Sequence, residues 1–256
     1  MPRLLYPLYA LVAYAIGLAS ILYLVGFIAD LWVPKTINAG PAAALPAGAW
    51  TNAAVLTAFL VLHSVMARPA FKARWTRLVP ESLERATYIL VSGLTTFALA
   101  WAWQPMPAVV WDAGDGATAM SLYSVQALGW LTIVLATFNI DHFAFFGLRQ
   151  AWDRFHQRRH QPAPFTARFL YGLVRHPISL GWLLVFWSTP RMTEGHLLFA
   201  GVMTAYIALV TPLEERDLVD AIGDDYRRYR RRVRAFLPWP RREGDSHAQA
   251  LRDRTQ

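Results

Sequence analysis

Long uncharged runs, separated by polar segments, dominate the pattern of hydrophobic and polar residues in this chain. A helix that crosses a bilayer needs about 20 mostly apolar residues, and most of these runs approach or exceed that length. The pattern therefore predicts an all-α fold, a polytopic bundle of transmembrane helices. The apolar runs cover residues 4–33, 50–66, 86–103, 117–140, 177–190 and 196–213.

The fifth run, residues 177–190, is unusually short. Its roughly 14 residues extend about 21 Å as a helix, less than the roughly 30 Å of a hydrocarbon core. Either this helix ends inside the protein or crosses a thinned bilayer, or the fifth and sixth runs form a re-entrant hairpin. We expect five or six spans, and the length of the run leaves that choice open.

The charged residues are few and unevenly distributed. Hydrophobic residues make up 55% of the chain and charged residues only 16%, which is too apolar for an ordinary soluble domain. The formal net charge of +8 comes from basic residues between and after the apolar runs. That placement follows the positive-inside rule and argues against nucleic-acid binding. With six spans, all Arg-rich segments fall on one side, so we predict a multi-pass protein of the bacterial inner membrane with both termini cytoplasmic.

Residue content excludes or disfavours several kinds of site. The chain has no Cys, which excludes disulfides, thiolate metal sites and a covalent Cys nucleophile. His156 and His160 are four residues apart and could share a metal ion on a helix. No carboxylate ligand stands at a recognisable spacing from them, so we predict no metal site. The first apolar run is too long for the core of a signal peptide and is interpreted as a retained span.

The clearest chemical signal is Arg175-His176-Pro177 at the start of the fifth run. Proline is favoured at the first position of a helix, so the basic pair should lie at the mouth of a membrane helix, where N–H groups and the helix dipole attract anions. Glu214 and Glu215 end the sixth run and point about 100° apart, so at least one should face the bundle. If the two helices are antiparallel neighbours, these groups form a site at one membrane surface. The alternatives are a basic interfacial anchor and carboxylates paired with arginines of the tail.

The segment after the carboxylate pair predicts a helix, a break at Gly223 and a second short helix. Tyr226 and Tyr229 are three apart and share a face, where they could cover the ring of a ligand or pack on the bundle. Residues 236–240, Phe-Leu-Pro-Trp-Pro, are interpreted as an aromatic clamp laid back on the membrane face.

Two further histidines are candidates for chemistry. Asp141 and His142 follow the fourth run, where the carboxylate could orient the imidazole as a general base or simply cap a helix. His63 lies inside an apolar run, which is unusual, and we interpret it as a hydrogen-bonded structural histidine.

Several of these elements occur together, in order, in a known family. Arg175-His176-Pro177-x-x-x-Gly181, Glu214-Glu215, the Gly223 break with its two tyrosines, and the closing Phe-Leu-Pro resemble the C-terminal core of isoprenylcysteine carboxyl methyltransferase-like membrane enzymes. Residues 141–150, with the N-terminal spans, more narrowly resemble the bacterial methanethiol S-methyltransferases and their NnrU-type relatives. Where the wider family has Tyr two residues after the His-Pro, this chain has Ser179.

This resemblance implies a cofactor and a division of the chain. The implied cofactor is S-adenosyl-L-methionine, held between the last two membrane helices and the C-terminal tail. Residues 1–140 would be N-terminal transmembrane helices, 141–242 the methyltransferase core and 243–256 a disordered tail. The implied cofactor-binding residues are Tyr171, Val174, Arg175, His176, Pro177, Glu214, Glu215, Tyr226 and Tyr229.

The implied activity is S-adenosylmethionine-dependent methylation of a small thiol, most simply methanethiol to dimethyl sulfide. A thiolate is the stronger nucleophile, and His142 and Glu215 are the candidate bases. One alternative is a lipid-like acceptor, a prenyl-cysteine carboxylate or a phospholipid amine. Another is a non-enzymatic membrane factor in nitrogen-oxide metabolism. The expected partners are the thiol and the lipid bilayer, with no nucleic acid and no obligate protein partner evident.

Overall fold

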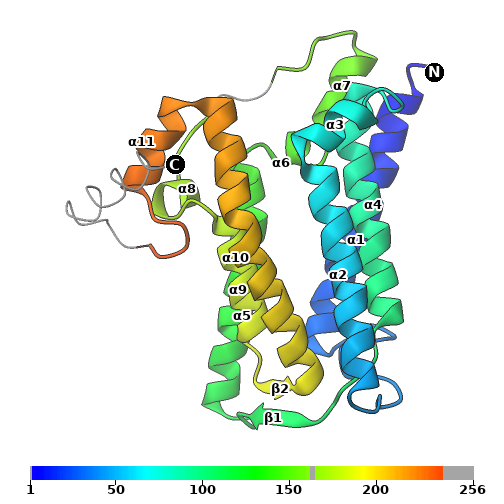
Figure 1. Ribbon diagram of the computed structural model, residues 1–256, viewed down its shortest axis with the longest axis vertical. Helices are drawn as coiled ribbons and strands as arrows, with labels where there is room; N and C mark the ends of the chain where they lie inside the picture. Colours follow the sequence, from blue (N-terminus) through cyan, green and yellow to red (C-terminus); the bar gives the residue numbers. More distant parts are fainter. Residues whose placement is uncertain (1, 162–164, 239–256) are drawn as a thin grey trace.

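Long helices run between the two ends of the molecule in the computed structural model, which describes residues 2–161 and 165–238 (Figure 1). Each coincides with one of the apolar runs, so the predicted all-α bundle is confirmed. The chain passes from end to end six times within the described ranges, and the fifth and sixth runs lie lengthwise in the bundle. The helices are α1 (Leu5–Ala29), α2 (Ala47–Ala67), α4 (Glu81–Ala102), α5 (Ala117–Asn139), α9 (Pro177–Trp187) and α10 (Glu194–Ile222).

Not all of these helices could cross a bilayer by length and composition. In the described part of the chain, α1, α2, α5 and α10 are long and apolar enough, whereas α9 is apolar but short. Helix α4 begins at Glu81 rather than at the predicted residue 86, because the acidic Glu81 and Glu84 favour the positive end of the helix dipole. Helix α10 extends past the predicted residue 213 and stops before Gly223, whose φ of 75° favours glycine.

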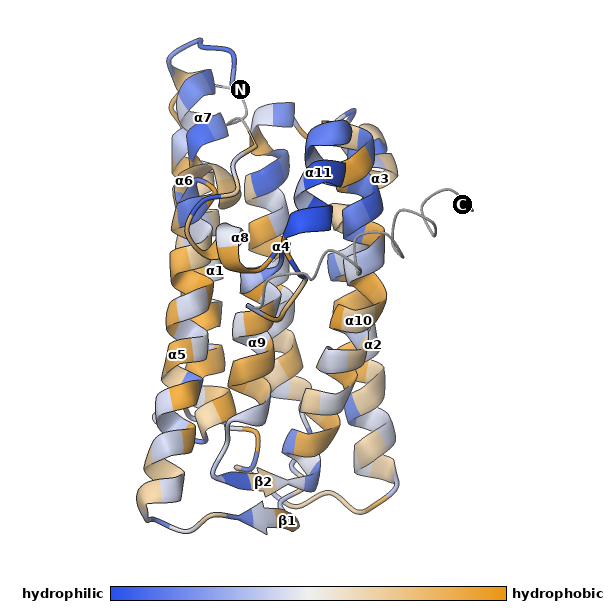
Figure 2. Ribbon diagram, turned by 90° about the vertical axis from the view of Figure 1, so that its left-hand side faces the viewer, coloured by the Kyte–Doolittle hydropathy of each residue, from blue (hydrophilic) through white to orange (hydrophobic). Residues whose placement is uncertain are grey.

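The short helices gather at one end of the bundle. Three of them, α3 (Pro69–Trp75), α7 (Leu148–Phe155) and α11 (Asp224–Arg232), are rich in charged residues, and Figure 2 shows that end as its most hydrophilic part. The start of α1 and the last described helix both lie there, as an even number of passes requires. The basic segments therefore share one end, as the loop charges predicted. The other short helices at this end are α6 (His142–Phe145) and α8 (Leu170–Leu173).

A two-stranded antiparallel sheet at the opposite end was not predicted. Strands β1 (Val109–Asp112) and β2 (Arg191–Thr193) join the α4–α5 connection to the α9–α10 connection. Segments of three and four residues are too short to show a two-residue period, and their pairing partner is remote in sequence. The same end is closed by side-chain hydrogen bonds: the Asn52 amide donates to the Gln104 carbonyl at 2.7 Å, and the Trp103 indole donates to the Ile37 carbonyl at 3.1 Å.

Two helix pairs pack at glycine contacts, as is common in membranes, where small residues let backbones approach closely. On α1 and α4, an added Cβ at Gly93 would lie 3.2 Å from the Gly17 Cα. On α5 and α9, an added Cβ at Gly181 would lie 2.7 Å from the Gly129 carbonyl oxygen and 2.6 Å from the Ile133 side chain. Gly181, the glycine of the motif, is therefore required by the packing of α9 against α5. A buried aromatic core, formed by Phe27, Trp103, Phe186 and Phe199, joins the two halves nearer the sheet.

We predict that Gly181→Ala destabilises the protein by about 1–3 kcal/mol, because its methyl group would overlap the backbone of α5. Thermal unfolding of the detergent-purified protein should show a lower Tm. The matched control is Gly201→Ala in α10, where an added Cβ meets nothing within 4 Å. An unchanged Tm for Gly181→Ala would contradict this packing.

Candidate functional site

The turn that starts α9 is held by the C-terminal tail. Pro177 is the first residue of the helix, as predicted. Val174, immediately before the basic pair, is extended and forms a parallel β-bridge with Arg234. The Arg175 N–H donates to the Arg234 carbonyl at 2.8 Å, and the His176 N–H donates to the Ala235 carbonyl at 3.0 Å. The tail thus lies along the turn and covers the mouth of the helix.

A buried charge cluster lies beneath this turn. Two guanidinium nitrogens of Arg175, Nε and Nη2, each lie 2.7 Å from the Oε1 of Glu215. The His176 Nε2 lies 3.0 Å from the same oxygen. All three residues are 8% exposed. The structure therefore brings together the basic pair of α9 and a carboxylate of α10, and it confirms that one glutamate faces the bundle.

The remaining guanidinium nitrogen of Arg175 binds the tail. Its Nη1 donates to the Arg230 carbonyl at 3.1 Å and to the Val233 carbonyl. All three nitrogens of this guanidinium therefore have protein partners, and Glu215 balances its charge. Arg175 links α9, α10 and the tail, so its ion pair also has a structural role.

Glu214 differs from its neighbour in exposure. Its side chain is 45% exposed, and the Nδ1 of His176 lies 3.9 Å from one of its carboxylate oxygens. Burial, together with this carboxylate, raises the pKa of Tyr171, which places Tyr171 within electrostatic range of Glu214. Glu214 is thus the member of the acidic pair that is open to a ligand.

The two predicted tyrosines of α11 do share a face, and both are buried. Their rings lie 5.7 Å apart, and Phe165 packs edge-on against both. The Tyr229 hydroxyl donates to the Tyr171 carbonyl at 2.6 Å. Burial and the nearby Glu215 raise the pKa of Tyr226 to about 12, and burial also raises the pKa of Tyr229. Both phenols therefore stay neutral at physiological pH. The hydrogen bond of Tyr229 also connects α11 to α8.

The clamp predicted for residues 236–240 lies partly outside the described residues. Phe236 packs against the main hydrophobic cluster of the bundle and lies 5.8 Å, ring to ring, from His176. Leu237 is 63% exposed. The aromatic contact with His176 therefore comes from Phe236.

His142 lies on α6, apart from the charge cluster. Its Nε2 is 3.0 Å from the Tyr14 hydroxyl and its Nδ1 is 2.8 Å from the Thr137 hydroxyl, and its ring stacks on Phe138. Asp141 accepts the Ala144 N–H at 3.1 Å and so caps α6, the second of its two predicted roles. Burial lowers the pKa of His142, outweighing the opposite effect of Asp141, so the imidazole is neutral at pH 7. Its role as a base stays a prediction.

The histidines of the α7 region bind separate partners. His160 pairs with Asp153 at 2.8 Å, and the His156 ring nitrogen lies 3.1 Å from the Trp152 carbonyl. Across residues 2–161 and 165–238, no group of three or more His, Asp or Glu residues is placed to hold a metal ion.

A second polar cluster lies among the long helices, and sequence reasoning found only one of its members. His63 of α2 contacts Tyr88 of α4, with 2.7 Å between Nε2 and the hydroxyl. A tyrosine inside an apolar run carries no signal of its own, so only the unusual His63 indicated this cluster.

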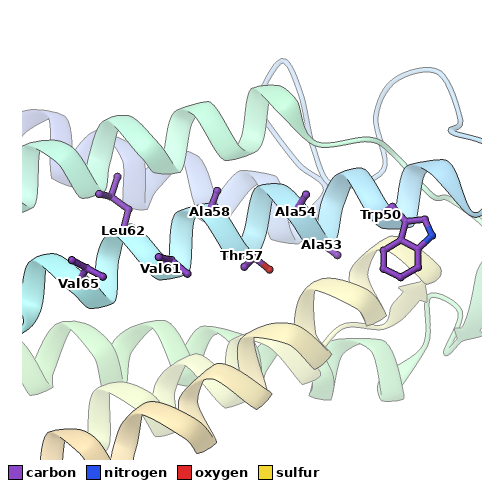
Figure 3. Close-up of a pocket in the computed structure, with 8 residues that line it drawn as sticks. All are labelled: Trp50, Ala53, Ala54, Thr57, Ala58, Val61, Leu62 and Val65. Carbon is purple, nitrogen blue, oxygen red and sulfur yellow. The ribbon is translucent and has the colours of Figure 1, made fainter.

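A groove is also present on the surface of the bundle. It has a volume of about 730 Å³ and follows one face of α2 (Figure 3). Seven of its eight lining residues are exposed, and all of them belong to α2, so the groove lies on the outer face of the bundle. The lining residues are Trp50, Ala53, Ala54, Thr57, Ala58, Val61, Leu62 and Val65.

Comparison with known proteins shows close relatives over nearly the whole chain. The methanethiol S-methyltransferase of Mycobacterium tuberculosis is 45% identical over 242 residues, which is 94% of this chain and 99% of that protein. The chain belongs to the methanethiol S-methyltransferase family. Another member, methanethiol S-methyltransferase 1 of Bradyrhizobium diazoefficiens, is 43% identical over 91% of this chain and 82% of its own length.

A more distant relative lies outside this family. Human nurim is 29% identical over 178 residues, covering 66% of this chain and 67% of nurim. No protein-family model and no solved structure matches the chain. Membership in the methanethiol S-methyltransferase family therefore rests on the close relatives, and it confirms the family resemblance of the motifs.

We predict that Arg175→Met loosens the tail in this family member. Removing one partner of a buried ion pair costs about 3–5 kcal/mol, and here it also removes two hydrogen bonds to tail carbonyls. Limited trypsin digestion should therefore cleave within α11 much faster than in the unchanged protein. Arg168→Met, at an exposed position before α8, is the matched control. Equal cleavage rates in the two variants would show that Arg175 does not hold the tail.

Proposed function

We propose that this protein methylates methanethiol to dimethyl sulfide with S-adenosyl-L-methionine as the methyl donor. Membership in the methanethiol S-methyltransferase family supports the reaction. The observation that supports the place of reaction is the buried Arg175–Glu215–His176 cluster, because it draws the tail over the start of α9 and leaves Glu214 open beside it.

The residues around Glu214 suit this cofactor. S-adenosylmethionine carries an ammonium group, a carboxylate and a sulfonium, and it supplies an activated methyl group when bound. We place the cations near Glu214 and the neutral Tyr171, and the carboxylate near the N–H groups at the start of α9. In this arrangement Arg175 and Glu215 shape the site by holding the tail. Val174, His176, Pro177, Tyr226 and Tyr229 complete the proposed cofactor site.

The main catalytic role that we assign to the protein is to align the two reactants. Methyl transfer to a thiol is an in-line displacement, so the chain must orient the thiol and exclude water from it. The chain has no Cys to carry a methyl group, so both reactants must be bound together. His142 and Glu215 remain the candidate bases from the sequence. Glu215 is already ion-paired with Arg175 and in hydrogen-bond contact with His176, which weakens its case, whereas His142 is neutral and able to accept a proton.

We propose a location that follows from the charge distribution. The end of the bundle with α3, α7 and α11 carries the basic segments and would face the cytoplasm. Both termini would then be cytoplasmic and the sheet would face the periplasm of a bacterial inner membrane. The cofactor would enter from the cytoplasm, while methanethiol can arrive through the lipid.

Membranes that contain this protein, supplied with S-adenosylmethionine and methanethiol, should release dimethyl sulfide into the headspace. Gas chromatography measures it, and membranes from cells without the gene are the control. Membranes that release none but methylate a prenyl-cysteine carboxylate or a phospholipid amine would replace the thiol with a lipid acceptor. Absence of any S-adenosylmethionine binding would favour a non-enzymatic membrane factor.

We predict that Glu214→Gln weakens S-adenosylmethionine binding by about 1.5–3 kcal/mol, the usual loss for a hydrogen bond to a charged group. Calorimetry on the detergent-purified protein measures it. Asp220→Asn, an exposed carboxylate further along α10, should bind as the unchanged protein does. Equal affinities for both variants would remove Glu214 from the cofactor site.

A further inference from the structure

We propose that His63 and Tyr88 form the acceptor side of the active site, where Tyr88 receives the hydrogen bond of the thiol and His63 takes up its proton. This inference rests on the proposed function, because it assigns the proton acceptor for the same reaction. It differs from the bases indicated by the sequence, since both groups lie on helices of the N-terminal half.

The two side chains are linked by a short hydrogen bond. The Nε2 of His63 lies 2.7 Å from the Tyr88 hydroxyl, and its Nδ1 lies 3.2 Å from the Ser92 hydroxyl. The ring of Phe59 stacks on the imidazole with 5.6 Å between centroids. Ser92 can therefore accept an Nδ1–H, which leaves Nε2 as the acceptor for the Tyr88 hydroxyl. That tautomer is the one a proton relay through the phenol requires.

Helix α2, which carries His63, packs against α10, the helix that carries the acidic groups. Ser64, next to His63 on α2, donates to the Tyr206 hydroxyl of α10 at 2.9 Å, and Arg68, one turn further, pairs with Asp217 at 2.9 Å. His63 lies close to Arg68 on α2, and Glu214 lies close to Asp217 on α10, so the relay and the proposed cofactor site lie toward the same end of the bundle.

The surroundings suit a small apolar acceptor. Met66, Ile89 and Phe146 are buried and pack with Tyr88 in one cluster. Little charge is available there to bind a polar head group, apart from the guanidinium of Arg85, which lies 5.0 Å from the centre of the Tyr88 ring. An ionisable histidine inside a membrane helix is costly and usually functional. A one-carbon thiol therefore finds apolar contacts and one proton-accepting group.

The proton balance of the reaction explains what the pair does. The thiol S–H donates to the Tyr88 oxygen while the Tyr88 hydroxyl donates to the His63 Nε2. As the new S–C bond forms, the electron pair of the breaking methyl–sulfonium bond goes to the cofactor sulfur, the thiol proton passes to Tyr88, and the phenolic proton passes to His63. The imidazolium then releases one proton to water. The positive charge of Arg85 stabilises the negative charge that develops on the sulfur and the phenol oxygen.

The experiment compares Tyr88→Phe and His63→Gln with the unchanged enzyme in purified form. General base catalysis contributes about 10²–10⁴-fold. Each variant should lose that factor in kcat/KM for methanethiol and keep its affinity for S-adenosylmethionine. With hydrogen sulfide, which is smaller and more acidic, the loss should shrink at least tenfold because less help with deprotonation is needed. Tyr9→Phe is the matched control, since its hydroxyl pairs with Thr87 at 2.9 Å on the α1 side of α4.

Four results would overturn the inference. Full activity of both variants would show that the pair takes no part. An equal loss with both thiols, or weaker cofactor binding in both variants, would give the pair a purely structural role. An unchanged enzyme that binds S-adenosylmethionine but methylates neither thiol would instead defeat the proposed function, and the relay with it.

Discussion

The ion pair of Arg175 with Glu215 is the interaction on which the arrangement of this protein's site depends. It joins the start of α9 to the end of α10, and through Arg175 it also holds the carbonyls of the tail. A buried pair is expensive to desolvate and is stable only when its remaining hydrogen bonds are satisfied. Here the carbonyls of the tail and His176 satisfy them, so the geometry of the site and the position of the tail depend on each other.

The long helices place this pair at the edge of an apolar bundle. Glycine contacts bring α9 against α5 and α4 against α1, and the aromatic core and the sheet close the opposite end. A second polar pair, His63 and Tyr88, joins α2 to α4, and α2 in turn contacts the acidic helix α10. This division suits a reaction between a charged cofactor from the aqueous side and a small apolar thiol from the lipid.

Much of the fold was predictable because a membrane constrains sequence strongly. Each apolar run became a helix, Pro177 began α9, and Gly223 ended α10. The sheet was missed, because two very short segments pair only after the helices have placed them. For the site, the positions of the motifs predicted that a basic pair and a carboxylate pair would meet. The hydrogen bonds from Arg175 to carbonyls of the tail could not be predicted, because backbone carbonyls have no signal in the local sequence.

The sequence by itself determined the class of fold, the family and the elements of the site, since hydrophobic length, a helix-starting proline and ordered motifs are local properties. Only the tertiary structure decided which glutamate is buried, that Asp141 caps a helix, and that Tyr88 meets His63. The physical reason is that the rotation of a helix about its own axis depends on its neighbours. The helical period sets the angle between Glu214 and Glu215, but packing against neighbouring helices sets which way each of them points.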